Sequence, residues 1–117
     1  MNADQIRTLK PGPELDRAVY HALFDEQASL PGPRRLVAYP SYSATWKALG
    51  LVVEEMERRG WWWRRKRSAD RFYSGFFRFN VLYEDPEPDI PGESDAHAAA
   101  KAALLAIAAE RAGRGEG

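Results

Sequence analysis

The stretch GWWWRRKR (residues 60–67) predicts the first strand of a β-hairpin, followed by a turn at 68–70 and a second strand over about 71–83. Successive side chains of a strand point to opposite faces, so we expect Trp61 and Trp63 in the core and Trp62 on the other face. In the second strand the apolar residues fall mostly at odd positions. This pattern predicts a core face of Tyr73, Phe77, Phe79, Val81 and Tyr83, and a wet face that includes Ser74, Arg78 and Asn80.

Helical patterns lie on both sides of the hairpin. Apolar spacing predicts a first helix over about 13–24 and a second helix that begins at an N-cap at Ser43 and ends at Gly60. We expect the second helix to bury a face made of Trp46, Leu49, Val53 and Met56. An alanine-rich third helix is expected from Ser94 or Asp95 to about Ala112, with a buried face of Ala96, Ala100, Ala103, Leu104 and Ile107. The acidic, proline-rich segment 84–93 is expected to be a loop that does not join the sheet.

The order helix, helix, strand, strand, helix predicts an α+β fold, in which an antiparallel hairpin-based sheet is flanked by helices in a layered sandwich. The length of 117 residues fits one domain, over residues 1–112, with a flexible tail at 113–117. Residues 1–10 contain no apolar segment typical of a secretory signal, and no stretch has the length of apolar sequence that spans a membrane. The sequence therefore favours a cytoplasmic protein without a membrane partner.

No pattern of catalytic or metal-binding residues stands out. The chain has no cysteine, which excludes a disulfide scaffold, a thiolate zinc site and a cysteine nucleophile. His21 and His97 lie in different predicted helices without metal-ligand spacing, and we expect them at the surface or at helix ends. The serines lack the context of a nucleophile elbow, and no glycine-rich phosphate loop is present. We therefore expect no enzyme activity, no catalytic residue, no metal and no cofactor.

The formal net charge of zero conceals a segregation of charge. Residues 58–67 contain six cations and no acid, whereas residues 84–95 contain six acids and no base. A chain that is neutral as a whole is unusual for a general DNA-binding protein. One interpretation is a dipolar surface that steers a partner. The alternative is that a solvated hairpin is basic and a loop is acidic.

The hairpin holds the candidate partner-binding residues, which are Trp62, Arg64, Lys66, Arg67 and Arg71. An exposed aromatic beside cations can stack on a base or anchor a protein interface. Three alternatives stay open: Trp62 is buried under a helix, it is covered by an arginine, or the cations merely keep an edge strand from aggregating. Arg65 shares the parity of Trp61 and Trp63, so we expect it at the rim of the core face, paired with an acid.

Several segments resemble the phage ABA-sandwich domain family of small phage and prophage proteins. The opening PGPELD (residues 11–16) is similar to that family's first helix, and Tyr42, Ser43 and Trp46 followed by Val52-Val53-Glu54 are similar to its second helix. Gly60-Trp61 matches its strand entry, and the alanine-rich stretch around 102–105 its closing helix. The resemblance covers roughly residues 9–108 and departs from the family at 64–67 and 84–93. It implies an α/β sandwich of phage or prophage origin, and it transfers no catalytic residue.

These observations favour a non-enzymatic binding protein that occupies a surface on a host macromolecule, for example as an inhibitor of a bacterial defence system such as a CRISPR effector. The partner would be a host protein or ribonucleoprotein complex in the cytoplasm of an infected or lysogenic bacterium. The alternative is a nucleic-acid-binding accessory protein that uses residues 62–71. A weaker resemblance to the double-stranded RNA-binding domain fails at the start of the last helix, where Asp95 and His97 stand in place of lysines. The sequence leaves a homo-oligomer open.

Overall fold

The computed structural model describes residues 2–24, 40–68, 71–77 and 90–113. This part of the chain contains four α-helices, one π-helical turn and three strands, which confirms the predicted α+β fold class. Helix α1 and strand β3 were not predicted. The elements in chain order are α1 (Ala3–Thr8), α2 (Pro13–Val19), the π-helical turn η1 (Tyr20–Phe24), α4 (Trp46–Arg58), β1 (Trp62–Ser68), β2 (Arg71–Phe77), β3 (Ile90–Gly92) and α5 (Asp95–Gly113).

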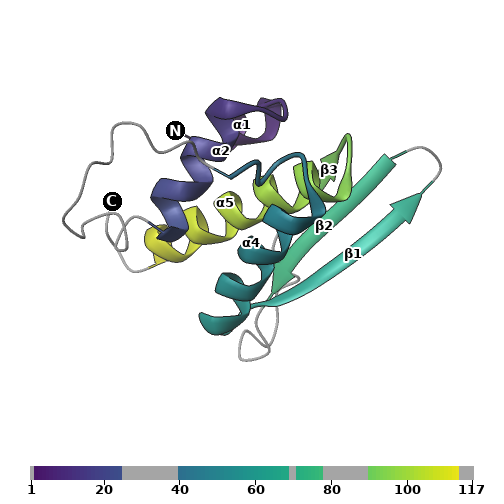
Figure 1. The fold of residues 1–117 in the computed structure, drawn as a ribbon. Coiled ribbons are helices and arrows are strands. Elements are labelled where there is room, and N and C mark those ends of the chain that lie inside the picture. The colour runs from purple at the N-terminus through teal and green to yellow at the C-terminus, as the bar shows by residue number, and fades with distance from the viewer. Residues whose placement is uncertain (1, 25–39, 69–70, 78–89, 114–117) are drawn as a thin grey trace, which may run out of the picture.

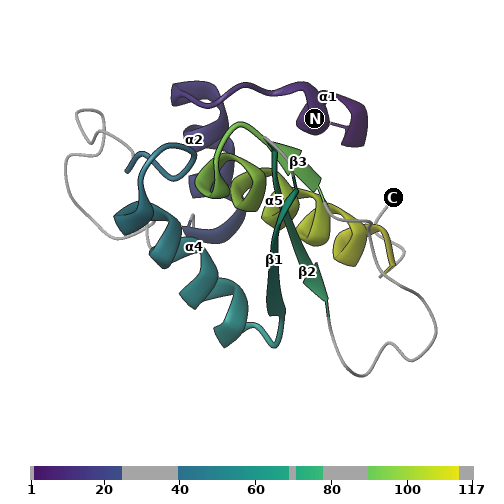
Figure 2. The same cartoon turned by 90° about the vertical axis from the view of Figure 1, so that its right-hand side faces the viewer.

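The elements are arranged in layers. The strands form an antiparallel sheet in the order β1-β2-β3, so β2 is central and β1 lies at one edge of the described sheet. Helices α4 and α5 pack next to each other against one face of this sheet, and α1 and α2 pack on α5 from its far side (Figures 1 and 2). Within the described ranges, no helix is long and apolar enough to cross a membrane.

The register of the hairpin divides its side chains between two faces. Residues paired directly across antiparallel strands point to the same face. Trp63 pairs with Phe76 and Arg65 with Ser74, and these residues lie on the side of α4 and α5. We call the other side the open face. Its positions on the hairpin are Trp62, Arg64, Lys66 and Ser68 of β1, and Arg71, Tyr73, Gly75 and Phe77 of β2.

The predicted core face of the second strand is wrong. Ser74 is 0% exposed and Phe76 is 3% exposed, whereas Tyr73 and Phe77 are only half-buried. Phe76 belongs to the hydrophobic core, and the Ser74 hydroxyl accepts a hydrogen bond from Trp63 Nε1 at 3.3 Å, which satisfies a buried polar group. Adjacent aromatic residues at 72–73 and at 76–77 place a ring on each face of β2, so alternation alone could not show which face is buried. The predicted continuation over 78–83 lies outside the described residues.

The expectation that segment 84–93 stays out of the sheet is also wrong at its end. Ile90–Gly92 forms β3, which pairs with β2 through Ile90 and Ser74. Pro91 is compatible with a strand here because β3 lies at the other edge of the described sheet. Proline lacks the N–H donor that a central strand needs, and it is tolerated on edge strands. Residues 84–89 are outside the described residues.

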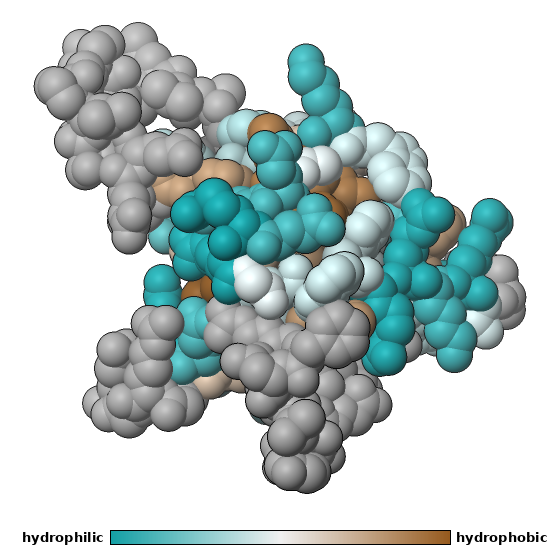
Figure 3. Space-filling view, turned by 90° about the horizontal axis from the view of Figure 1, so that it is seen from below, coloured by the Kyte–Doolittle hydropathy of each residue, from teal (hydrophilic) through white to brown (hydrophobic). Residues whose placement is uncertain are grey.

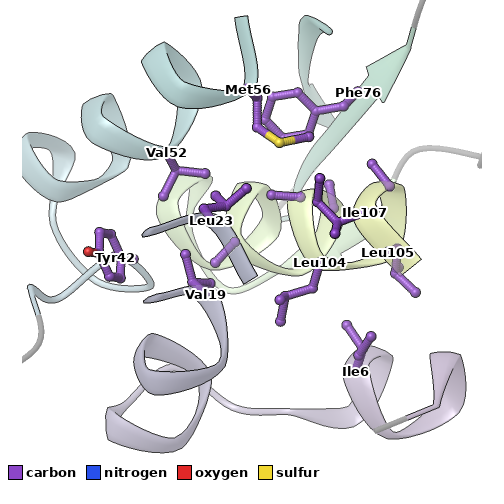
Figure 4. Packing of buried hydrophobic residues seen from close by; sticks show 14 of the residues in the cluster. Ile6, Val19, Leu23, Tyr42, Val52, Met56, Phe76, Leu104, Leu105 and Ile107 are labelled. Atoms are coloured by element: carbon purple, nitrogen blue, oxygen red, sulfur yellow. The ribbon is translucent and has the colours of Figure 1, made fainter. Parts of the chain in front are cut away.

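The core gathers around α5, which is central to the molecule. Leu15 of α2 belongs to this cluster. Val19 of α2 and Leu23 of η1 meet Val52 and Met56 of α4 around α5, and Phe76 packs against the cluster from the sheet (Figure 4). Every residue of α5 from 96 to 107 is buried, which includes the predicted face. Small alanine side chains allow this helix to be surrounded by close neighbours on all sides.

Helix α4 confirms its predicted end but not its predicted start. Gly60 follows the helix with φ +94°, a conformation that favours glycine. The N-cap is Thr45, whose hydroxyl accepts from the Ala48 N–H at 3.2 Å. Ser43, the predicted cap, is instead buried and bonded to Asp16. Trp46, predicted in the core, is 61% exposed, because the later start of the helix places it in the first turn, at the edge of the buried face.

Candidate functional site

The open face of the hairpin collects four of the five candidate residues. Trp62, Arg64 and Lys66 occupy alternate positions of β1, and Arg71 pairs with Ser68 at the tip of the hairpin. All four are exposed, and Trp62 exposes 51% of its surface, so its predicted alternative of burial under a helix is wrong. Figure 3 shows long hydrophilic side chains projecting on the side where Figure 1 places the hairpin.

Arg67 is separated from the other candidates. Its register partner is Phe72, and both belong to the helix-side face. The guanidinium of Arg67 lies 5.2 Å from the centre of the Phe72 ring, a cation–π contact within the hairpin. Arg67 therefore does not share a face with Trp62, although the sequence placed it in the same cation run.

The open face combines aromatic rings with positive charge. Phe77 pairs with Trp62, and the guanidinium of Arg64 lies 5.8 Å from the centre of the Phe77 ring. Tyr73 continues the aromatic row towards the tip. None of the open-face positions of β1 and β2 carries an acid, and Pro91 holds the corresponding position of β3. The surface is thus suited to an anionic partner that also offers a flat or apolar group to stack on.

Arg65 forms a second aromatic–basic arrangement on the helix side. Its guanidinium lies 5.2 Å from the Trp46 ring centre and 5.8 Å from that of Trp63, and its Nη1 is 3.7 Å from Asp95 Oδ2. The expected position of Arg65 at the rim, paired with an acid, is confirmed. The contact of Arg65 with Trp46 was not predicted. It could have been inferred from Thr45, because a helix capped at this threonine has Trp46 in its exposed first turn. Arg65 links β1 to the first residues of α4 and α5.

His97 lies in the first turn of α5, at a helix end as predicted, but it is buried and not at the surface. Its Nδ1 accepts from the Glu93 N–H at 2.9 Å, and its Nε2 donates to the Leu9 carbonyl at 2.8 Å. Lys101, one turn further along α5, is also buried and donates from Nζ to the Arg7 carbonyl at 3.2 Å. Together they bind the last turn of α1 and its C-cap residue to the central helix. In the part of the chain that the structure describes, no three His, Cys, Asp or Glu side chains group as metal ligands.

Burial lowers the pKa of His97 below its ordinary value of 6.5, and the charge of Lys101 lowers it further, against opposing effects of the Leu9 carbonyl and Glu93. A group whose pKa is depressed on folding stabilises the fold above its unfolded pKa, and this contribution is lost as pH falls. We expect the free energy of unfolding to decrease between pH 7.5 and 5, by at most about 1.4 kcal/mol per pH unit for one proton.

Urea unfolding across this pH range, with the wild type and two variants, checks this prediction. His97→Gln should flatten the dependence, because an amide can keep both hydrogen bonds without titrating. His21→Gln, at an exposed histidine of η1, is the matched substitution for comparison. Glu55 does not interfere in this pH range. The hydrogen bond from Arg58 is the main cause that lowers the pKa of Glu55 from its ordinary value of 4.5, so the stability that this carboxylate contributes is lost only below about pH 4.5. Equal slopes for His97→Gln and the wild type would contradict the assignment.

In comparisons with known proteins, no family model, no curated protein and no solved structure matches this chain. The resemblance to the phage ABA-sandwich family therefore stays a prediction, and the open face carries the functional argument.

Proposed function

We propose that this chain is a non-enzymatic binding protein that uses the open face of its hairpin to occupy an anionic surface on a macromolecular partner. The observation that carries the proposal is the position of Trp62. Its indole is 51% exposed and shares a face with Arg64, Lys66 and Arg71, while the described strands place no acid there. Tryptophan and arginine are the side chains most enriched among residues that dominate binding energy at interfaces.

The partner that we propose is a host protein or ribonucleoprotein complex in the bacterial cytoplasm, with the chain acting as a phage-encoded inhibitor of a defence system, similar in kind to an anti-CRISPR protein. Small size, segregated charge and the resemblance of residues 9–108 to small phage proteins support this proposal. Inhibition by occupancy needs a surface and no catalytic group. An exposed anchor and positively charged surroundings are sufficient for such a role.

Affinity capture from a bacterial lysate tests the proposed function. The wild type, Trp62→Ala with Arg64→Glu, and Arg17→Glu would be used as baits, each with and without nuclease treatment. Arg17 is an exposed cation of α2, which packs on the side of α5 away from the sheet, so it controls for the charge change alone. We expect a partner retained by the wild type and Arg17→Glu and lost by the double variant. A partner set that is identical for all three baits would overturn the proposal.

A further inference from the structure

The positions of Trp62, Arg64 and Lys66 narrow the chemistry of the partner, and the argument rests on the proposed function of the open face. The three residues alternate along β1 and therefore project in one row. Residues two apart in a strand are separated by about 6.5–7 Å. That repeat is close to the spacing of successive phosphates in an extended single strand of nucleic acid. A row of cations with this spacing can follow the phosphates of one strand.

The exposed indole of Trp62 supplies the second element of such a site. A nucleobase stacks on an aromatic side chain whatever its identity, because every base has a π-face. Trp62 lies at the start of β1, and Arg64, Lys66 and Arg71 continue from it towards the hairpin tip. A base stacked on Trp62 would thus place the next phosphates over the cations. A base pair within a duplex could not present its face to this indole without being unstacked.

The cations on the opposite side of β1 are held by intramolecular contacts. Arg65 lies against Trp46 and Trp63, with Asp95 nearby, and Arg67 lies over Phe72. Arg64 on the open face also makes a cation–π contact, with Phe77, so the two rows of cations differ in direction: one faces α4 and α5, and the other faces away from them. The open face is therefore distinguished by its direction and by the exposed Trp62 indole in the same row as Arg64 and Lys66.

We propose that the open face binds single-stranded nucleic acid, with Trp62 as the stacking platform and Arg64, Lys66 and Arg71 as the phosphate contacts. A protein partner with an acidic surface would also satisfy the cations and pack on the indole, but its carboxylates have no regular repeat that matches the row on β1. The single strand can belong to a ribonucleoprotein complex, which agrees with the partner class proposed above.

Fluorescence anisotropy with labelled probes tests the proposal. The probes are a single strand of deoxythymidylate, a single strand of uridylate, a DNA duplex and a poly-glutamate peptide, each at two salt concentrations. We expect both single strands to bind more tightly than the duplex and the peptide. With three phosphate contacts, the logarithm of the affinity should fall with the logarithm of salt concentration with a slope of about −2. Trp62→Ala should weaken single-strand binding by about ten- to hundredfold.

Matched variants on one strand locate the site. Arg64→Gln with Lys66→Gln should reduce the salt slope to about −0.7, because one phosphate contact remains. Arg67→Gln removes one positive charge from the neighbouring position on the other face and should leave the affinity within about twofold. An equal loss for Arg67→Gln, or no single-strand binding at low salt, would overturn the proposal. Tighter binding to poly-glutamate would also overturn it while leaving the proposed function intact. Failure of the proposed function would be seen separately, as an identical partner set for all three baits in the lysate capture.

Discussion

Replacing Gly92 with alanine is expected to lower the free energy of unfolding by about 3 kcal/mol, the upper end of the usual cost of overpacking. Gly92 ends β3 directly against α5. A Cβ at this position would lie 2.5 Å from the Ala98 N atom and 2.7 Å from its Cα. Both atoms belong to the backbone of the central helix, so no flexible side chain can move aside. Either β3 or α5 must shift, and α5 is packed on all sides.

Gly50→Ala is the matched control for Gly92→Ala. Gly50 lies within α4, and an added Cβ meets no atom within 4 Å. Alanine has the higher helix propensity, so this variant should gain up to about 1 kcal/mol. Urea unfolding monitored by circular dichroism measures both. If Gly92→Ala were as stable as the wild type, the close approach of β3 to α5 would be wrong.

Replacing Asp16 with alanine is expected to cost about 3 kcal/mol, because it removes the shared acceptor of a buried network. Asp16 Oδ1 accepts from the Ser43 N–H at 2.8 Å and from the Ser43 hydroxyl at 2.7 Å. The Ser43 hydroxyl in turn accepts from the Gly12 N–H at 2.9 Å. The network joins the start of α2 to the turn before α4. Without the carboxylate, a buried N–H and a buried O–H lose their partner.

Two comparisons separate this network from a general charge effect. Glu14→Ala removes an exposed carboxylate from the same helix, and loss of its favourable interaction with the helix dipole should cost only about 0.5 kcal/mol. Asp16→Asn keeps one acceptor oxygen and should fall between the two. Equal unfolding free energies for Asp16→Ala and Glu14→Ala would show that the Ser43 network does not stabilise the fold.

Local patterns predicted those parts of the fold that depend on neighbours in the sequence. Strand alternation in β1 placed Trp62 on the outer face and Arg65 at the rim beside an acid, because each residue's direction follows from the one before it. The glycine after α4 was identified for the same reason, since a helix end needs a residue that tolerates positive φ.

The features that the sequence did not predict depend on distant contacts. His97 is buried because it bonds Leu9, which follows α1 and lies 88 residues earlier in the chain. Local spacing predicts Ser43 as an N-cap, whereas its hydroxyl bonds Asp16, 27 residues earlier, a contact that no local pattern indicates. Strand β3 follows a proline-rich segment, and only its pairing with β2 makes it a strand. The face of β2 could not be assigned until packing against α5 selected Phe76 over Phe77.

The separation of the two faces of β1 is the central claim, and site-specific photocrosslinking in bacterial cells tests it for any class of partner. A benzophenone side chain would replace either Lys66, on the open face, or Arg67, on the helix side. The two positions are adjacent and equally charged in the wild type, so they differ mainly in direction. We expect crosslinks to a protein or nucleic acid from position 66 and none from position 67. Crosslinks from position 67 alone, or equally from both, would contradict the assignment of the open face as the binding surface.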